Sequence, residues 1–162
     1  MIRLFKLAFI SIIILFIIAT GISLMIPSHI RISKAINIKS ERDSVLSLIR
    51  DQHKWSTWYP AFMQMESNKQ IQPVKVTMLQ QNDSEVVARL QQVDKRPFIN
   101  GWTVYEHATA DSLTLQWYMD FKLAWYPWQK FGSLFYENLY GTMMQQGLEN
   151  IRNIEQGTRN NE

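Results

Sequence analysis

Glu106 is the side chain whose place in the sequence most favours acid–base chemistry. It follows Trp102 and Val104 in an alternating segment, so a regular strand would aim its carboxylate into an apolar interior. Desolvation there would favour the protonated carboxyl, which could anchor a ligand or act as an acid. A strand end or a bulge at this point would instead return Glu106 to solvent, which is the commoner arrangement.

His53 and Asp120 are the other candidates for an acid or a base. His53 lies beside Trp55 and Trp58 and could serve as a general base, although such a histidine is more often a cation that interacts with the dipole at a helix C terminus. Asp120 alternates with apolar neighbours, so we expect it on the outward face of a strand, which argues against a catalytic role. A cyclase- or hydratase-type enzyme that uses one of these groups remains an alternative.

Metal, nucleotide and covalent chemistry find no support in the sequence. There are no cysteines, and the three histidines form neither a His-x-His nor a His-Glu-x-x-His motif. A Gly-x-Ser-x-Gly elbow, a glycine-rich phosphate loop and a dinucleotide fingerprint are all absent from it. We therefore expect no metal and no cofactor.

Aromatic and long apolar side chains are the more informative feature, and all six tryptophans follow residue 27. Small-molecule pockets are mostly apolar with few polar groups, so inward-facing members of this set could line a cavity for a lipid or another hydrophobic molecule. Ordinary filling of a core is the alternative for each of them. The candidate lining residues are Trp102, Val104, Glu106, Trp117, Met119, Phe121, Trp125, Phe135, Leu139 and Met143.

The positive charge of the chain does not indicate a nucleic-acid partner. The formal net charge is +3, but Arg3 and Lys6, close to the N terminus, account for two of the 17 basic residues, against 14 acidic ones. The rest of the chain is close to neutral and has no basic run. Because binding to a phosphate backbone needs several clustered cations, we expect no nucleic-acid binding.

Residues 7–26 form an uncharged segment that predicts a membrane-spanning helix. As a helix they would extend about 30 Å, the hydrocarbon thickness of a bilayer. A cleaved signal peptide is the alternative, with small residues at 19–21, but its apolar region usually stops at about 15 residues. Arg3 and Lys6 favour an N terminus inside the cell, despite basic residues at 31 and 34, so the domain is expected on the extracytoplasmic, periplasmic side.

The chain after Pro27 predicts one α+β domain. Residues 29–39 alternate between apolar and polar, as a half-buried strand does, with Lys34 as an exception on the apolar face. Ser40 is expected to cap a helix that runs towards His53, and residues 55–60 predict a short second helix or turn. Residues 74–90 predict a hairpin turning at 82–84.

The second half of the domain predicts strands followed by one long helix. Asn100-Gly101 introduces a strand to Glu106, and a turn is expected at Ala110-Asp111-Ser112. Alternate residues from Leu113 to Trp125 are apolar, which predicts a long antiparallel strand. A helical apolar stripe from residue 131 to 154 predicts a single C-terminal helix that covers the sheet, followed by a polar, frayed tail at 156–162.

The order of these elements resembles the helix-grip fold of the START and birch-pollen-allergen superfamily. Residues 35–40, followed by Asp51, Trp55, Trp58, Tyr59 and Pro60, look like the opening signature of its polyketide cyclase/dehydrase and lipid-transport branch, often labelled SRPBCC. Residues 117–121 resemble a late strand of that branch, and residues 147–151 resemble its terminal helix. The resemblance covers residues 28–155, preceded by the anchor at 1–27 and followed by the tail at 156–162.

This resemblance implies a curved sheet that grips the terminal helix, with a cavity for hydrophobic ligands between them. Because such folds host carriers, cyclases and receptors alike, the resemblance alone does not decide the function. We expect a membrane-tethered module that binds a hydrophobic molecule without turnover. The alternatives are the enzyme described above and a regulatory domain whose surface binds another envelope protein.

Overall fold

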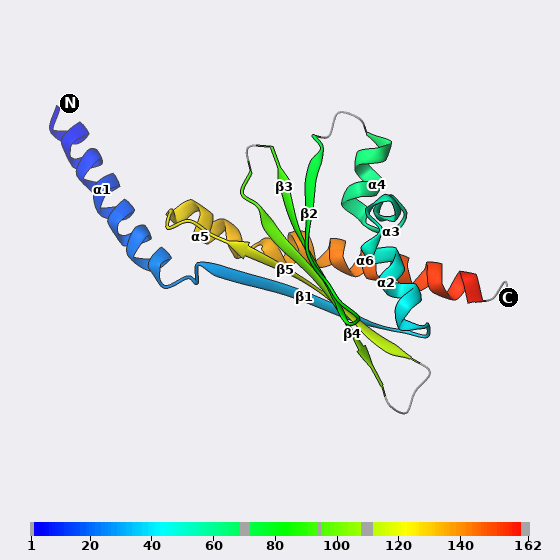
Figure 1. Cartoon of the computed structure of the whole chain (residues 1–162). Coiled ribbons are helices and arrows are strands. Elements are labelled where there is room, and N and C mark those ends of the chain that lie inside the picture. The colour runs from blue at the N-terminus through cyan, green and yellow to red at the C-terminus, as the bar shows by residue number, and fades with distance from the viewer. Residues whose placement is uncertain (1, 69–71, 94, 108–111, 160–162) are drawn as a thin grey trace.

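The computed structural model describes residues 2–68, 72–93, 95–107 and 112–159. One long helix, α1 (Ile2–Leu24), projects away from a curved sheet and its covering helices (Figure 1). From Arg3 to Leu24 this helix has the length and composition of a membrane span, criteria that a signal sequence near an N terminus also meets. Most of α1 is exposed, but Ser23 in its last turns is buried, and the helix contacts α5 (Pro127–Ser133).

Five antiparallel strands form one sheet in the order β1-β5-β4-β3-β2. The strands are β1 (His29–Ile38), β2 (Val74–Gln81), β3 (Glu85–Gln92), β4 (Phe98–Glu106) and β5 (Leu113–Lys122). The hairpin between β2 and β3 is confirmed, and the Asn82 side chain stabilises its turn by accepting hydrogen bonds from the backbone N–H groups of Ser84 and Glu85 at 3.0 and 2.6 Å. Most of the turn expected at Ala110-Asp111-Ser112 lies outside the described residues.

Helices cover one face of the sheet, and the longest of them lies along its concave side (Figure 1). They are α2 (Arg42–Arg50), the 3-10 turn η1 (Gln52–Lys54), α3 (Trp55–Trp58), α4 (Pro60–Ser67), α5 (Pro127–Ser133) and α6 (Tyr136–Arg159). Tyr59 separates α3 from α4 in an extended conformation, as expected for a residue that precedes a proline. This arrangement confirms the α+β helix-grip fold.

The last strand is shorter than the alternation predicted, because β5 ends at Lys122 rather than Trp125. The Leu123 N–H still donates to the Ser28 carbonyl at 2.8 Å, but the Ala124 N–H donates to the side chain of Gln129 at 2.9 Å. That bond turns the chain into α5. The expected inward position of Trp125 is therefore wrong, and 60% of its surface is exposed.

The C-terminal helix is also interrupted, contrary to the prediction of one continuous helix. The N–H groups of Leu134 and Phe135 donate to the carbonyls of Phe131 and Gly132, each at 3.2 Å, and these three-residue steps separate α5 from α6. Phe135, in this interruption, is exposed. The helix then continues to Arg159, so residues 156–159 of the expected frayed tail are helical, while 160–162 lie outside the described residues.

Ser40 does not cap α2, because the residue at that position is Glu41, whose side chain makes no capping hydrogen bond. Ser40 and Ser44 instead donate their hydroxyls to one carboxylate oxygen of Glu155 in α6, with 2.7 Å between Ser44 Oγ and Glu155 Oε2. Glu155 is buried and needs such donors. These bonds connect the start of α2 to the end of α6.

Lys34, the exception on the apolar face of β1, is explained by a partner on α6. Its ammonium nitrogen lies 2.6 Å from a carboxylate oxygen of Glu137. The lysine stem extends beside Gly141, where a Cβ atom would come within 3.0 Å of Lys34 Cε. Lys34 therefore spans from the sheet edge to the first half of α6 instead of entering the core.

The second half of α6 approaches the sheet most closely at Gly147. A Cβ atom added there would lie 2.6 Å from the Trp117 ring and 3.2 Å from Pro60. Trp117 is fully buried and packs against the rings of Trp58, Tyr59 and Trp102, which oppose any shift of its own ring. Only glycine permits this approach.

Gly147→Ala should therefore destabilise the domain. The overlap with Trp117 should lower the free energy of unfolding by about 1–3 kcal/mol, despite the higher helix propensity of alanine. The matched control is Gly157→Ala in the same helix, where an added Cβ meets no atom within 4 Å, and stability should stay the same or rise by up to about 1 kcal/mol. Denaturant unfolding of the full chain in detergent, followed by tryptophan fluorescence, measures both. Equal effects of the two substitutions would contradict the contact.

Candidate functional site

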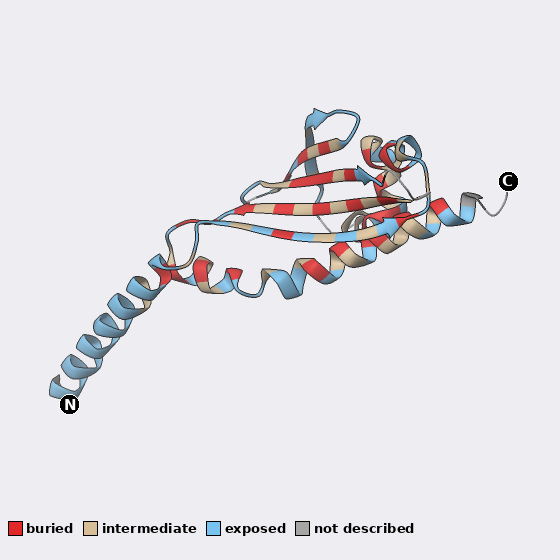
Figure 2. Cartoon of the chain, turned by 90° about the horizontal axis from the view of Figure 1, so that it is seen from below, coloured by how far each residue is buried: buried red, intermediate tan, exposed pale blue. Residues whose placement is uncertain are grey.

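The concave face of the sheet is built by alternation along β4 and β5. Phe98, Asn100, Trp102 and Val104 share this face of β4, and Trp102 lies opposite Trp117 of β5 in the strand register. Figure 2 shows the resulting alternation of buried and less buried residues along the strands. The face divides into two halves that differ in how completely α6 and its neighbours cover them.

The half that lies under α2, α3 and α4 is closed. Its rings are 0–1% exposed and pack at centroid distances of 4.8 to 6.1 Å, mostly edge-on or tilted, which is favourable for aromatic pairs. Trp55 and Trp58 also donate their indole N–H groups to backbone carbonyls of α2 at 2.8 and 3.1 Å. This closed half consists of Trp55, Trp58, Tyr59, Trp102 and Trp117.

The other half, towards α5 and α1, is only partly covered. Phe98 stacks on Phe121 at 5.3 Å, and Phe121 in turn contacts Tyr140 at 4.7 Å and Tyr136 at 5.0 Å. Phe98, Tyr136, Tyr140 and Met143 are partly buried hydrophobic residues packed against the core, rather than part of its closed interior. These five residues define the open half of the concave face.

Asn100 supplies a polar group at the boundary between the two halves. It is fully buried, and its side-chain oxygen accepts a 2.8 Å hydrogen bond from the Trp117 indole. Its amide nitrogen lies near the Tyr59 hydroxyl, but neither that nitrogen nor Trp102 Nε1 has a hydrogen bond of normal geometry within the described part of the chain. Two buried donors therefore face an aromatic interior, an arrangement that usually has a functional or structural reason.

Burial raises the pKa of Tyr59 far above its ordinary value, and the neighbouring Tyr140 hydroxyl adds to this effect. Burial likewise raises the pKa of Tyr140. Both hydroxyls are consequently neutral at physiological pH. They can donate hydrogen bonds, but they are poor bases.

A separate groove lies between β1 and α6 and is lined by none of the residues of the open half. It has a volume of about 540 Å³, is open to solvent, and is crossed by the ion pair of Lys34 with Glu137. Its lining residues are mostly polar or charged, unlike those of the aromatic cavity that the sequence predicted. The lining residues are Lys34, Glu137, Asn138, Gly141, Thr142, Gln145, Gln146 and Glu149.

No family model and no curated protein matches this sequence. Solved structures with the same fold include XoxI from Bacillus cereus, with a TM-score of 0.56 and 11% identity over 80% of this chain and 97% of the other. A START superfamily protein from Mycobacterium smegmatis matches with a TM-score of 0.54 and 12% identity over 79% and 98%. The di-domain ARO/CYC StfQ from the steffimycin biosynthetic pathway matches with a TM-score of 0.59 and 6% identity over 82% and 52%.

The domain shares the helix-grip fold with these structures. Structural matches at such low sequence identity establish the fold but not the function, which must be argued from the site itself. In this helix-grip domain the region between sheet and α6, where the closed and open halves meet, is therefore the candidate site.

The predicted lining residues divide into three groups. Trp102, Val104 and Trp117 lie in the closed interior, whereas Met119, Phe121 and Met143 lie at or beside the open half. The expected inward positions of Trp125, Phe135 and Leu139 are wrong, because 60%, 68% and 65% of their surfaces are exposed. The early end of β5 and the interruption between α5 and α6 explain why these three side chains are exposed.

The candidate acids and bases do not meet. Glu106 ends β4 on the surface, with an exposed side chain 3.6 Å from Arg42, which is the strand-end arrangement that sequence reasoning favoured. Its place among the candidate lining residues is therefore wrong. Asp120 lies on the convex face, as predicted, in a two-point ion pair with Arg31 at 2.6 and 2.7 Å. His53 is exposed in η1. In the part of the chain that the structure describes, no three His, Asp or Glu side chains form a metal-binding group.

Sequence reasoning missed the residues that make the open half distinctive. Phe98 and Asn100 belong to β4 because the strand begins before the Asn-Gly pair, whereas the sequence pattern predicts its start at that pair. Continuing the alternation back from Trp102 would have identified both. Tyr136 and Tyr140 are one helical turn apart, and that spacing indicates a shared face of α6.

The raised pKa values predict a loss of stability at alkaline pH. Folding keeps Tyr59 and Tyr140 protonated above the ordinary value of 10.0, so their contribution is complete below that pH and is lost as the pH rises towards the folded pKa values. Unfolding at a series of pH values, with tyrosinate absorbance recorded in parallel, should show stability falling above about pH 10. Tyr59→Phe should make the fall shallower, with Tyr105→Phe as the control for removing a half-exposed hydroxyl. An unchanged slope in Tyr59→Phe would refute the assignment.

Proposed function

We propose that this protein is a membrane-tethered module that binds a lipid or another hydrophobic small molecule in the open half of its concave face, without turnover. The observation that carries the proposal is the contrast between the two halves. The closed half is filled by its own rings, while the open half presents aromatic rings that α6 covers only in part. A ligand there would complete the cover.

The physical gain would come from apolar surface removed from water. Each 100 Å² or so that a ligand covers contributes roughly 2.5 kcal/mol before the entropy of association is subtracted. Phe98, Phe121 and Tyr140 present flat rings, which suit an acyl chain or a ring system. The Met143 side chain can adapt to different shapes.

A buried donor would fix the orientation of such a ligand. Asn100, at the boundary with the open half, offers an N–H group without a partner of normal geometry in the described residues. A carbonyl or carboxyl oxygen that reached it would satisfy a donor whose burial otherwise costs about 1–3 kcal/mol. The preferred ligand is therefore mostly apolar with one oxygen-bearing end.

Retention of α1 as an anchor is supported by its contacts with the domain. Ser23 is buried, and the Lys130 ammonium in α5 donates to the Ile26 carbonyl at 2.6 Å and to the Ser28 hydroxyl at 2.8 Å. These bonds hold the connection between α1 and β1 against α5. With the N terminus inside the cell, the domain would lie on the periplasmic face of the membrane.

Binding without turnover is favoured by the separation of the acid and base candidates. Glu106, His53 and Asp120 lie at the end of β4, in η1 and on the convex face, and none of them lines the open half. The hydroxyls that do lie near the interior are neutral, since the pKa values of Tyr59 and Tyr140 are raised.

Native mass spectrometry of the full chain, released from detergent micelles, tests the binding proposal. We expect one apolar molecule per chain, either co-purified or taken up from an added long-chain fatty acid. Tyr140→Trp enlarges a ring of the open half and should reduce occupancy several-fold. Tyr105→Trp makes the same change on the convex face, where 50% of the tyrosine is exposed, and should leave occupancy unchanged. A bare mass with every added lipid would refute binding.

A further inference from the structure

Three aromatic residues, two in the connection after β5 and one in the first turn of α5, form a largely exposed cluster at the end of the domain from which α1 leaves. The Trp125 ring lies 4.8 Å from Tyr126, and Tyr126 stacks on Trp128 at 4.9 Å with only 7° between the ring planes. Trp125 and Trp128 are 60% and 64% exposed, although large aromatic side chains are usually well covered. We call these three residues the aromatic cluster.

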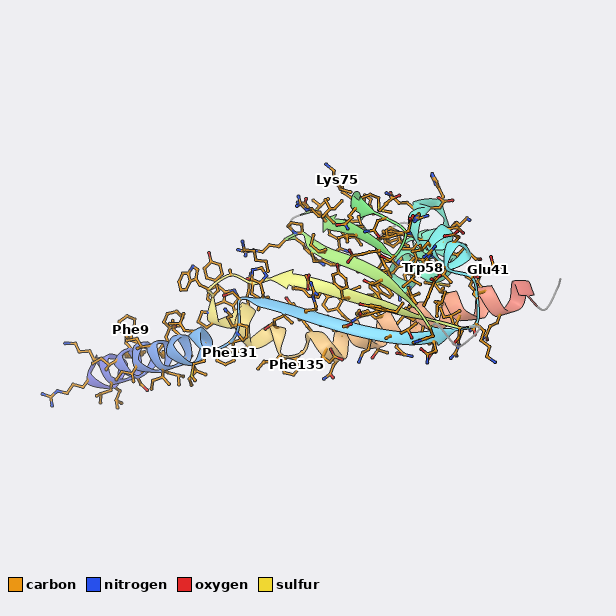
Figure 3. The ribbon with its side chains drawn as sticks, turned by 60° about the horizontal axis from the view of Figure 1, so that its bottom comes forward. Phe9, Glu41, Trp58, Lys75, Phe131 and Phe135 are labelled. Carbon is orange, nitrogen blue, oxygen red and sulfur yellow. The ribbon has the colours of Figure 1, made fainter. Side chains whose placement is uncertain are left out.

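The position of the cluster is fixed relative to α1. Pro127, between Tyr126 and Trp128, begins α5, and α5 contacts the last turns of α1. Lys130, one turn further along α5, is 3% exposed and holds the Ile26 carbonyl. Figure 3 shows Phe131 of α5 at the α1 end of the domain, whereas Trp58 marks the closed half at the other end.

The connection between α1 and the sheet is too short to let this end move far from a membrane. Four residues separate Leu24 from His29, and four extended residues reach at most about 14 Å. Two of them continue the helical turn instead, since the N–H groups of Met25 and Ile26 donate to the carbonyls of Ile22 and Ser23 at 3.1 Å. If α1 spans a bilayer, α5 and the aromatic cluster lie at its surface.

We propose that the aromatic cluster inserts into the headgroup and glycerol region of the leaflet at which α1 ends. This inference rests on the membrane tether proposed above. Indole and phenol rings combine an apolar body with a polar N–H or O–H group, which is why tryptophan and tyrosine concentrate at membrane interfaces. The continuity of the cluster with α1 identifies the bilayer, rather than another protein, as its partner.

Insertion would give the domain a fixed orientation on the membrane. A second contact point beside α1 prevents rotation about the short connection. Phe121 lies only four residues before Trp125, and Tyr136 lies eight residues after Trp128, so the open half begins next to the cluster. A lipid leaving the leaflet could then enter the open half without crossing water.

The distribution of tryptophans makes this inference testable by fluorescence. Four of the six, Trp55, Trp58, Trp102 and Trp117, are fully buried, and α1 contains none. The full chain is reconstituted into phosphatidylcholine vesicles whose acyl chains are brominated near the glycerol, because bromine quenches tryptophan only at close range. We expect up to about a third of the emission to be lost relative to vesicles without bromine, since two of the six tryptophans lie in the cluster.

The variant Trp125→Phe/Trp128→Phe should abolish this loss while keeping the rings and the fold. Wild-type protein that is equally bright in both kinds of vesicle would overturn the proposal. This holds if the cluster then faces water, as quenching by aqueous acrylamide would show, and equally if a second copy of the chain shields it. So would quenching that persists in the double variant. Flotation of the same vesicles separates the two claims: protein that fails to float refutes the tether, whereas protein that floats without being quenched refutes the insertion alone.

Discussion

The close approach of α6 to the sheet at Gly147 is the contact on which the rest of the domain depends. Trp117 contacts the helix there, and Trp58, Trp102 and Tyr59 pack around that ring. Because protein interiors tolerate neither voids nor overlaps, this contact sets the height of α6 above the concave face. Towards its N terminus the helix contacts the sheet through the Lys34–Glu137 ion pair and through the rings of Tyr136 and Tyr140, which remain partly uncovered.

A second constraint joins this interior to α1. Lys130 is a buried cation, and its ammonium is stable there because a backbone carbonyl and a hydroxyl take the place of water. The bonds bring the end of α1, the start of β1 and α5 to one place. The open half, the aromatic cluster and α1 consequently occupy the same end of the protein, and the closed half occupies the other.

Sequence patterns predicted the surfaces of the fold well and its interruptions poorly. Alternation from Leu113 to Phe121 correctly identified the buried face of β5, because period two follows directly from strand geometry. Local pattern did not reveal that the Gln129 side chain accepts a hydrogen bond from the Ala124 N–H. It also did not reveal that Glu155, far along the chain, accepts one from the Ser40 hydroxyl. Each competing partner is distant in sequence or in the next element, so neither the exposure of Trp125 nor the missing cap could be predicted from neighbours. The candidate site was predicted only as a face: alternation found Phe121, but which half of that face is covered depends on how α6 packs.

Methionine methyl NMR of the full chain in lipid nanodiscs tests most directly whether the open half takes an apolar ligand. Two of the eight methionines, Met119 and Met143, lie at or beside the open half, while Met63 and Met65 belong to α4. On addition of a long-chain fatty acid, the resonances of Met119 and Met143 should shift and saturate, and those of Met63 and Met65 should stay in place. Resonances of Met119 and Met143 that stay unchanged, or shifts confined to α4, would contradict the account.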